Sequence, residues 1–517
     1  MITRHFVQVG NRRVHYRRTG SGPPLLMAHQ SPRSSAEFEP LMTRWSSHFT
    51  CIAPDTPGFG QSDPLENPAP EIEDFADAVA ELLDALGLSQ VGAYGLYSGA
   101  TILIAAARRH PERFSAVAAN GYAAFRPEER AIFGERYTSP FKPTDYGEHL
   151  TWAWNRMLEQ NWFFPWYDAR DQARLPSTND DPVALHHAVM DLLASGDAYR
   201  LGYGAVLRAQ HQAPGPDEPT PPVLLTAAES DPFHKHLGRL RGLPANWRVQ
   251  DGTIDDATIA LCLQHLKAHP APSFASLPEA ADEGFVLVEA GGFKNLIHWK
   301  GDRESDTLAL HAPGRSLAVA TGGGELAIDL PGHGLSGDWR SSVKPSLADW
   351  VAVIAAAVEA LGAKPAVVTG DSWSALLAID VAKRLGAGRV EARRGWLPVP
   401  EAAPKWAEQV MFDARPDRFG QYLVAAWSAI RAWHFFWPWF EASAANAIPF
   451  DPADVTPDRL RIEHLAIMRA RKGRQLLTVL AQADRDALFR GAGVEIDWPL
   501  PAWARKRTDV WKPPSTR

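Results

Sequence analysis

The sequence has 517 residues but only two cysteines, Cys51 and Cys262. This pair forms neither the spacing of a zinc site nor a disulfide framework, and so few cysteines fit a reducing compartment. No stretch approaches the roughly 18 consecutive apolar residues of a membrane-spanning helix, and residues 1–10 lack the apolar core of a signal peptide. We therefore expect a cytoplasmic protein that has no metal site and does not contact a membrane.

The sequence also lacks a run of basic residues. It carries 53 lysines and arginines against 60 aspartates and glutamates, so its formal net charge is −7. A mildly acidic chain without a basic cluster is not typical of proteins that bind nucleic acids. No pattern indicates a cofactor, and we expect none. The length exceeds what one compact core accommodates, so we expect more than one domain.

Two parts of the chain resemble each other. PDTPGFGQSD at residues 54–63 reappears as IDLPGHGLSGDW at residues 328–339. Three pairs of landmarks are separated by 274, 275 and 273 positions, namely Pro57 and Pro331, Gly95 and Gly370, and Pro165 and Pro438. Because solenoid repeats have periods of about 20–50 residues, this spacing predicts a duplicated domain instead.

Strand patterns alternate with helical patterns in both copies, which predicts an α/β fold whose mostly parallel sheet is covered by helices on both faces. Copy 1 is predicted at residues 1–270, with a helical, Trp-rich cap at about 126–212. A linker follows at 271–284. Copy 2 is predicted at 285–517, with its cap at about 400–485. The residues after the second cap have room for one strand only, so copy 2 is incomplete.

Residues 91–109, VGAYGLYSGATILIAAARR, predict a strand, a sharp glycine-bounded turn and a helix. In copy 2 the corresponding turn is GDSWS, with Ser372 at its centre. This order is typical of the nucleophile elbow of the α/β-hydrolases, and both copies resemble that fold. Copy 1 resembles bacterial members that carry HQSPRSS after the third strand and APDTPGFGxSD after the fourth. The resemblance implies a nucleophile on the elbow, an acid and a histidine.

The expected catalytic triad is incomplete in both copies. In copy 1 the elbow residue is Tyr97, a poor nucleophile because its ordinary pKa is about 10, and Ser98 follows one place late. Asp231 stands where the resemblance implies the acid, but no histidine stands in the turn after the last strand. In copy 2 Ser372 has the nucleophile position without a base in sight, and a serine without a base is inert.

A polar loop, His29-Gln30-Ser31-Pro32-Arg33, stands where the resemblance implies an oxyanion hole. We expect Gln30 and Arg33 to bind a carboxylate or an enolate there, and His29 to form an acid–base pair with Tyr97. The alternative is that His29 bonds its own loop and Arg33 makes a surface ion pair. Trp162 and Trp166 of the cap are expected to roof the substrate pocket, unless they are core residues or part of an interface between the caps.

These residues favour a hydrolase-like enzyme for a small, partly apolar carbonyl or ester compound, with Tyr97 as hydrogen-bond donor or acid. The alternative is a catalytically inactive, duplicated module for binding or assembly. A third hypothesis is a composite site in which Ser372 takes a base from copy 1. Because an incomplete sheet exposes an edge that can pair with another chain, a homodimer is also expected.

Overall fold

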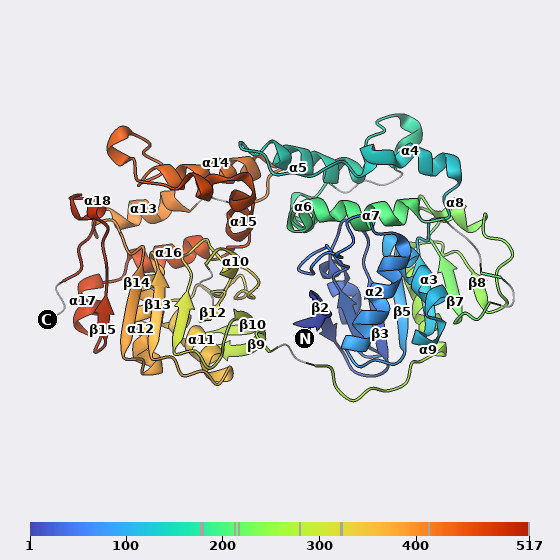
Figure 1. The fold of residues 1–517 in the computed structure, drawn as a ribbon, viewed down its shortest axis with the longest axis horizontal. Coiled ribbons are helices and arrows are strands. Elements are labelled where there is room, and N and C mark those ends of the chain that lie inside the picture. The colour runs from blue at the N-terminus through green and yellow to red at the C-terminus, as the bar shows by residue number, and fades with distance from the viewer. Residues whose placement is uncertain are drawn as a thin grey trace. The chain divides into compact units, whose positions relative to one another are not determined.

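The computed structural model describes residues 1–175, 180–210, 214–215, 218–278, 281–320, 324–411 and 414–514. The chain divides into two compact units, coloured along the sequence in Figure 1. Unit 1 comprises Met1–Lys142 and Trp152–Ala280, and unit 2 comprises Pro143–Thr151 and Ala281–Arg517. Pro143–Thr151 lies inside the predicted cap of copy 1 yet belongs to unit 2.

Unit 1 contains an eight-stranded sheet in the order β1-β2-β4-β3-β5-β6-β7-β8. Its strands are β1 (Thr3–Val9), β2 (Arg12–Thr19), β3 (Pro24–Ala28), β4 (Thr50–Pro54), β5 (Val91–Leu96), β6 (Phe114–Asn120), β7 (Val223–Thr226) and β8 (Trp247–Val249). β2 pairs antiparallel with β1 and with β4, and the other pairings are parallel. The expected mostly parallel sheet is thus confirmed.

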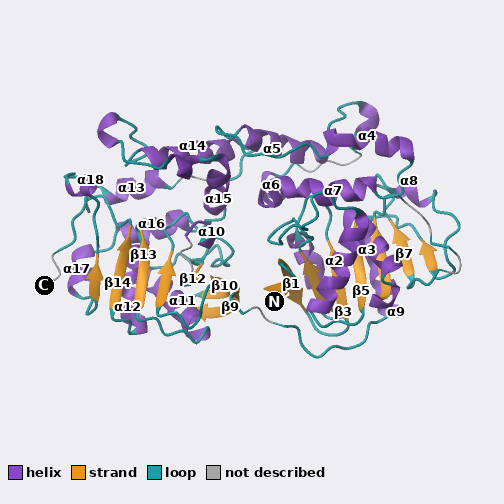
Figure 2. Cartoon of the chain, in the orientation of Figure 1, coloured by secondary structure: helices purple, strands orange, loops and turns teal. Residues whose placement is uncertain are grey.

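Helices cover both faces of this sheet, as Figure 2 shows. They are α1 (Glu39–Trp45), α2 (Ile72–Ala85), α3 (Ser98–Arg109) and α9 (Asp255–Ala268), with the short α8 (His234–Leu237) after β7. Alternate residues of β3 divide between two apolar clusters. Leu26 packs with α2 and α3, whereas Leu25 packs with α1 and α9, because successive side chains of a strand point to opposite faces. The helices of the cap are α4 (Pro127–Tyr137), α5 (Glu148–Gln160), α6 (Pro182–Ser195) and α7 (Tyr199–Arg208).

Unit 2 contains a seven-stranded sheet in the order β15-β14-β13-β11-β12-β10-β9. Its strands are β9 (Glu283–Ala290), β10 (Phe293–Lys300), β11 (Thr307–Leu310), β12 (Leu326–Ile328), β13 (Val367–Asp371), β14 (Arg389–Arg393) and β15 (Glu495–Asp497). β9 begins inside the predicted linker. β15 lies at an edge of the sheet, after the cap helices of this unit.

The helices of unit 2 follow the same alternation with strands. They are α10 (Leu317–Ala320), α11 (Leu347–Ala360), α12 (Ser374–Leu385), α13 (Ala403–Val410), α14 (Gln421–Phe435), α15 (Pro457–Met468), α16 (Gly473–Ala481), α17 (Arg485–Arg490) and α18 (Ala502–Arg505). α12 packs on β13 and β14, so a strand, a turn and a helix stand where the second elbow was expected.

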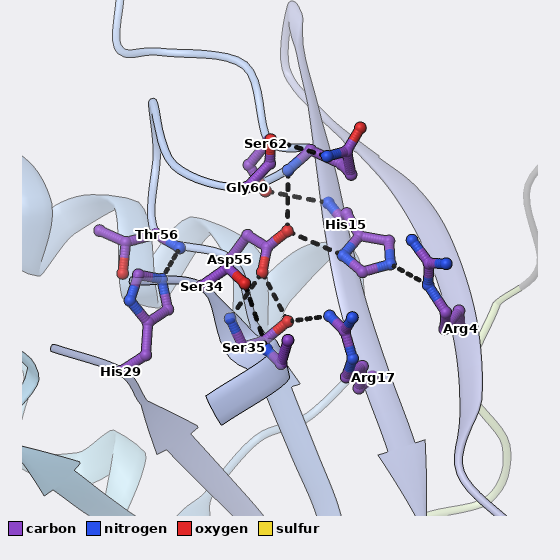
Figure 3. A network of polar contacts seen from close by, with 12 residues as sticks. Arg4, His15, Arg17, His29, Ser34, Ser35, Asp55, Thr56, Gly60 and Ser62 are labelled. Atoms are coloured by element: carbon purple, nitrogen blue, oxygen red, sulfur yellow. Dashed lines mark hydrogen bonds and ion pairs between the residues drawn. The ribbon is translucent and has the colours of Figure 1, made fainter. Parts of the chain in front are cut away.

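A buried polar network ties the start of the unit 1 sheet to the turn after β4 (Figure 3). The carboxylate of Asp55 accepts hydrogen bonds from His15 Nδ1 at 2.9 Å and from the backbone N–H groups of Ser35 and Gln61 at 2.8 Å. Arg4 Nε donates to His15 Nε2 at 3.1 Å. Burial lowers the pKa of His15 to about 3, so the ring is neutral.

Unit 2 has a corresponding network with a different outer partner. His298 Nδ1 bonds Asp329 at 2.8 Å, but its Nε2 faces the carboxylate of Glu283 at 3.1 Å. Burial alone would lower the pKa of His298, but hydrogen bonds to two carboxylates outweigh burial and raise that pKa. Each unit thus contains a buried histidine–aspartate pair. The histidine is neutral in unit 1, whereas its surroundings in unit 2 favour the charged form.

Candidate functional site

Tyr97 occupies the sharp turn between β5 and α3 of unit 1. Its backbone has φ +49° and ψ −110°, a conformation that non-glycine residues rarely adopt. A Cβ on Gly95 would lie 2.6 Å from Ala100 Cα, and a Cβ on Gly99 would lie 2.0 Å from the Ala28 carbonyl oxygen. The two glycines therefore let β5, α3 and β3 approach closely enough to hold the turn.

The phenol of Tyr97 points at the predicted acid. Its OH donates a hydrogen bond to Asp231 Oδ2 at 2.8 Å, and the N–H of Phe233 donates to Asp231 Oδ1 at 2.7 Å. The rings of Tyr97 and Phe233 meet edge to face, with centroids 5.6 Å apart. A Cβ on Gly121 would lie 2.6 Å from the Tyr97 ring. The surroundings of the turn thus accommodate a tyrosine ring.

Burial affects the ionisation of both groups in this pair. It raises the pKa of Tyr97, and the neighbouring Asp231 carboxylate raises that pKa further, so the phenol stays protonated near neutral pH. Burial also raises the pKa of Asp231, and the charge of Asp255 adds to the effect. The phenol of Tyr97 is consequently a hydrogen-bond donor near neutral pH.

Tyr97 and Asp231 line a cavity of about 410 Å³ between the strand ends and the cap of unit 1. Gln30 and Ser98 also line it, and the lining includes the aromatic residues Phe125, Tyr137, Phe164, Tyr203 and Phe233. Asp255, at the first position of α9, also lines the cavity, although sequence reasoning missed it. The sequence order could have predicted Asp255, because the helix that follows the last parallel strand begins at the sheet edge where the other site residues lie.

Ser98 is tied to the loop after β3. Its Oγ accepts a hydrogen bond from the Ser31 N–H at 2.6 Å and donates to Ser31 Oγ at 3.1 Å. Gln30 is also engaged, since its backbone N–H and side-chain amide donate to Glu37 at 2.7 and 2.9 Å. The amide of Ser31, in the loop where an oxyanion hole was expected, thus already has an acceptor within the protein.

The predicted pairing of His29 with Tyr97 is wrong. His29 Nδ1 bonds the Gln30 carbonyl at 2.9 Å, and its Nε2 accepts the Thr56 N–H at 2.9 Å, as Figure 3 shows for the second contact. The ring is 1% exposed and does not line the cavity. Both ring nitrogens form hydrogen bonds with backbone groups, which agrees with the alternative that His29 bonds its own loop.

The predicted contact of Arg33 with a bound anion is also wrong. Arg33 Nε forms an ion pair with Asp191 Oδ2 of α6 at 3.0 Å, and Ser34 Oγ bonds the other carboxylate oxygen at 2.7 Å. Among the residues that the structure describes, no arginine or lysine lines the cavity. The loop therefore fastens the cap helix and does not offer a cation to a ligand.

Trp162 and Trp166 do not line the cavity, so their predicted role as its roof is wrong. Trp166 Nε1 donates to the Tyr137 carbonyl at 3.1 Å, and its ring stacks under the guanidinium of Arg156. Phe164, between the two tryptophans in sequence, faces the cavity instead.

Ser372 lines a separate cavity of about 160 Å³ within unit 2 and has φ +53°. Beside it the guanidinium of Arg394 forms a two-pronged ion pair with Asp371. In the described ranges, no histidine hydrogen-bonds to Ser372, to Ser98 or to Tyr97. His434 pairs with Glu463 at 3.2 Å instead.

Within the described residues, no three histidine, cysteine, aspartate or glutamate side chains gather in a way that would hold a metal ion. None of the described helices combines the length and apolar character needed to cross a bilayer.

Part of the chain matches known proteins. Residues 23–257 match the family model described as alpha/beta hydrolase fold. A segment of 113 residues is 38% identical to 2-(acetamidomethylene)succinate hydrolase of Mesorhizobium japonicum, covering 22% of this chain and 40% of that protein. A segment of 105 residues is 32% identical to haloalkane dehalogenase 2 of Mycobacterium tuberculosis, covering 20% of this chain and 37% of that protein. The matched segments thus span about two fifths of the length of these curated relatives.

The crystal structure of the enol-lactonase from Burkholderia xenovorans LB400 aligns with a TM-score of 0.39 and 20% sequence identity. The alignment covers 50% of this chain and 98% of that one.

Proposed function

Because the chain has the α/β-hydrolase fold over residues 23–257, we propose that unit 1 is a hydrolase-like enzyme for a small, partly apolar carbonyl or ester compound. The observation that carries the proposal is the hydrogen bond of 2.8 Å between Tyr97 and Asp231 at the wall of the cavity. It sets a protonated donor beside a carboxylate, which is the pairing that general acid–base catalysis uses.

The reaction we propose forms no covalent intermediate with the protein. Asp231 takes a proton from a water molecule whose oxygen attacks the substrate carbonyl carbon. Tyr97 turns its OH to the carbonyl oxygen and stabilises the negative charge that develops there. When the bond to the leaving group breaks, Asp231 returns the proton to the leaving oxygen. The raised pKa of Asp231 suits this role, because a base works best when its pKa lies near the working pH.

The test is turnover of a panel of p-nitrophenyl esters by the full chain and its variants. Tyr97→Phe and Asp231→Asn are each expected to lower kcat by about 100-fold or more, with a smaller effect on KM. Asp251→Asn is the matched control, since its exposed carboxylate bonds His234 and does not line the cavity. Turnover by Tyr97→Phe equal to that of the wild type would refute the proposal.

A binding module without catalysis is the second candidate. It is favoured by the hydrogen bond of 2.6 Å from the Ser31 N–H to Ser98, which occupies a group that a carbonyl substrate would need. A wild-type protein that binds compounds in the cavity of unit 1 and hydrolyses no ester of the panel would establish this candidate instead.

We also propose that the two units arose by duplication. The His15–Asp55 and His298–Asp329 contacts, at 2.9 and 2.8 Å, join corresponding strands and turns and support this proposal. The homodimer and the composite site at Ser372 stay predictions. Sedimentation of the full chain tests the first, and turnover by Ser372→Ala tests the second.

A further inference from the structure

We propose that the cavity of unit 1 takes a positively charged ligand, so that the compound on which unit 1 acts carries an ammonium or similar cationic group. This inference rests on the proposed function of the same cavity, and it concerns the class of ligand, which neither the fold nor the relatives indicate.

The first argument is charge. Asp231 and Asp255 both line the cavity, and no lysine, arginine or histidine of the described ranges does so. Asp231 accepts hydrogen bonds from Tyr97 and from the Phe233 N–H, but no cationic side chain among the described residues forms an ion pair with it. Asp231 is half-buried, and removing a carboxylate partly from water without a counter-ion is unfavourable. A cationic ligand would supply that ion.

Two cationic side chains in the segment after Asp231 have carboxylate partners of their own. The ring of His234, three residues beyond Asp231, bonds Asp251 at 3.2 Å. Arg239 pairs with Glu129, with 2.8 Å between Nη2 and Oε1. These contacts pair both side chains with carboxylates that do not line the cavity.

The second argument is the aromatic lining. Phe125 and Phe164 meet Phe233 at centroid distances of 5.5 and 5.2 Å, with their planes nearly perpendicular. Tyr97 meets the same ring at 5.6 Å. Aromatic faces attract cations through their quadrupole, and the attraction grows when the cation is removed from water. A lining that combines carboxylates with aromatic rings suits an organic cation.

A further polar residue of the lining indicates how such a ligand would be held. Gln160 lines the cavity, and its side-chain carbonyl accepts a hydrogen bond from the buried guanidinium of Arg156. Arg156 therefore acts as a positioning residue that leaves the NH₂ group of Gln160 as the available donor. We infer that the cationic group faces Asp231 and Asp255 and that an oxygen acceptor of the ligand faces Gln160.

The test uses three probes of similar size and different charge with the full chain: benzylammonium, benzyl alcohol and phenylacetate. Calorimetric titration is expected to show about tenfold tighter binding of benzylammonium than of benzyl alcohol, and weaker binding of phenylacetate than of either. Equal affinity for the three probes, or a preference for phenylacetate, would overturn the inference.

Variants locate the effect. Asp231→Asn is expected to weaken benzylammonium binding about tenfold and Asp255→Asn about threefold, because Asp255 is exposed and its charge is screened by water. Benzyl alcohol binding should change little in either. Asp256→Asn is the matched control on the same helix turn, since Asp256 pairs with Arg44 at 3.1 Å and does not line the cavity. An equal loss in the Asp256→Asn and Asp255→Asn variants would contradict the assignment.

The two proposals fail separately. If benzylammonium does not bind while Tyr97→Phe abolishes ester turnover, the ligand class is wrong and the catalytic proposal stands. If benzylammonium binds as expected while Tyr97→Phe leaves turnover unchanged, the ligand class stands and the catalytic proposal is wrong.

Discussion

The close approach of Tyr97 to Gly121 makes a sharp prediction for Gly121→Ala. The new Cβ would lie 2.6 Å from Cδ1 and Cε1 of the ring, where ordinary contacts begin at 3.4 Å, so the ring must withdraw by 0.8 Å or more. Gly121 also has φ +69°, which costs an alanine about 1–2 kcal/mol. Overpacking adds about 1–3 kcal/mol, so we expect a total loss of about 2–5 kcal/mol.

Repeating the substitution in a Tyr97→Ala background separates these two terms. Without the ring, Gly121→Ala should cost only the backbone term of about 1–2 kcal/mol. Gly10→Ala is the matched control, because Gly10 has φ +57° and a Cβ there would meet nothing within 4 Å. The free energy of unfolding of unit 1 is measured by unfolding the full chain in urea and monitoring the hydrogen exchange of peptides from unit 1. Costs that agree within about 0.5 kcal/mol in the two backgrounds would refute the steric argument.

Three further predictions concern the other polar contacts. The raised folded pKa of His298 means that its contribution to the stability of unit 2 is complete below the unfolded pKa of about 6.5 and is lost as pH rises through the folded value. Urea unfolding at pH 6 and at pH 9 should therefore differ more for the wild type than for His298→Gln, and an equal difference would contradict this. Arg33→Ala should destabilise unit 1 by about 1 kcal/mol through loss of the Asp191 contact and leave benzylammonium affinity unchanged. Weaker probe binding in Arg33→Ala would place the arginine back at the cavity. Ser98→Ala should keep ester turnover within about twofold, whereas loss of a nucleophilic serine would lower kcat by several orders of magnitude.

The sequence was sufficient for the fold because its signals are local. The glycine spacing around Tyr97 indicates a sharp turn from a few residues of sequence, and the structure has that turn. The apolar runs of β3 and β5 similarly predict central strands, since strands buried on both faces need apolar residues throughout.

The side chains of the site were harder to predict because their partners come from distant segments. His29 is held by Thr56, and Arg33 is held by Asp191, 158 residues away. Nothing near these residues in sequence indicates those partners. Asp255 differs from these residues, because the resemblance implies a histidine in the turn before α9 and so assigns no role to an aspartate there.

The strained turn at Tyr97 has a consequence for which substitutions the protein tolerates at this position. A positive φ at a non-glycine residue costs about 1–3 kcal/mol, and both Tyr97 and Ser372 adopt it although neither has a histidine partner in the described residues. Close packing at Gly95 and Gly99 holds the turn of unit 1 whatever side chain it presents. The residue at the centre of the turn can therefore be substituted while the backbone of the turn and the sheet stay the same, so this position can acquire a side chain with different chemistry.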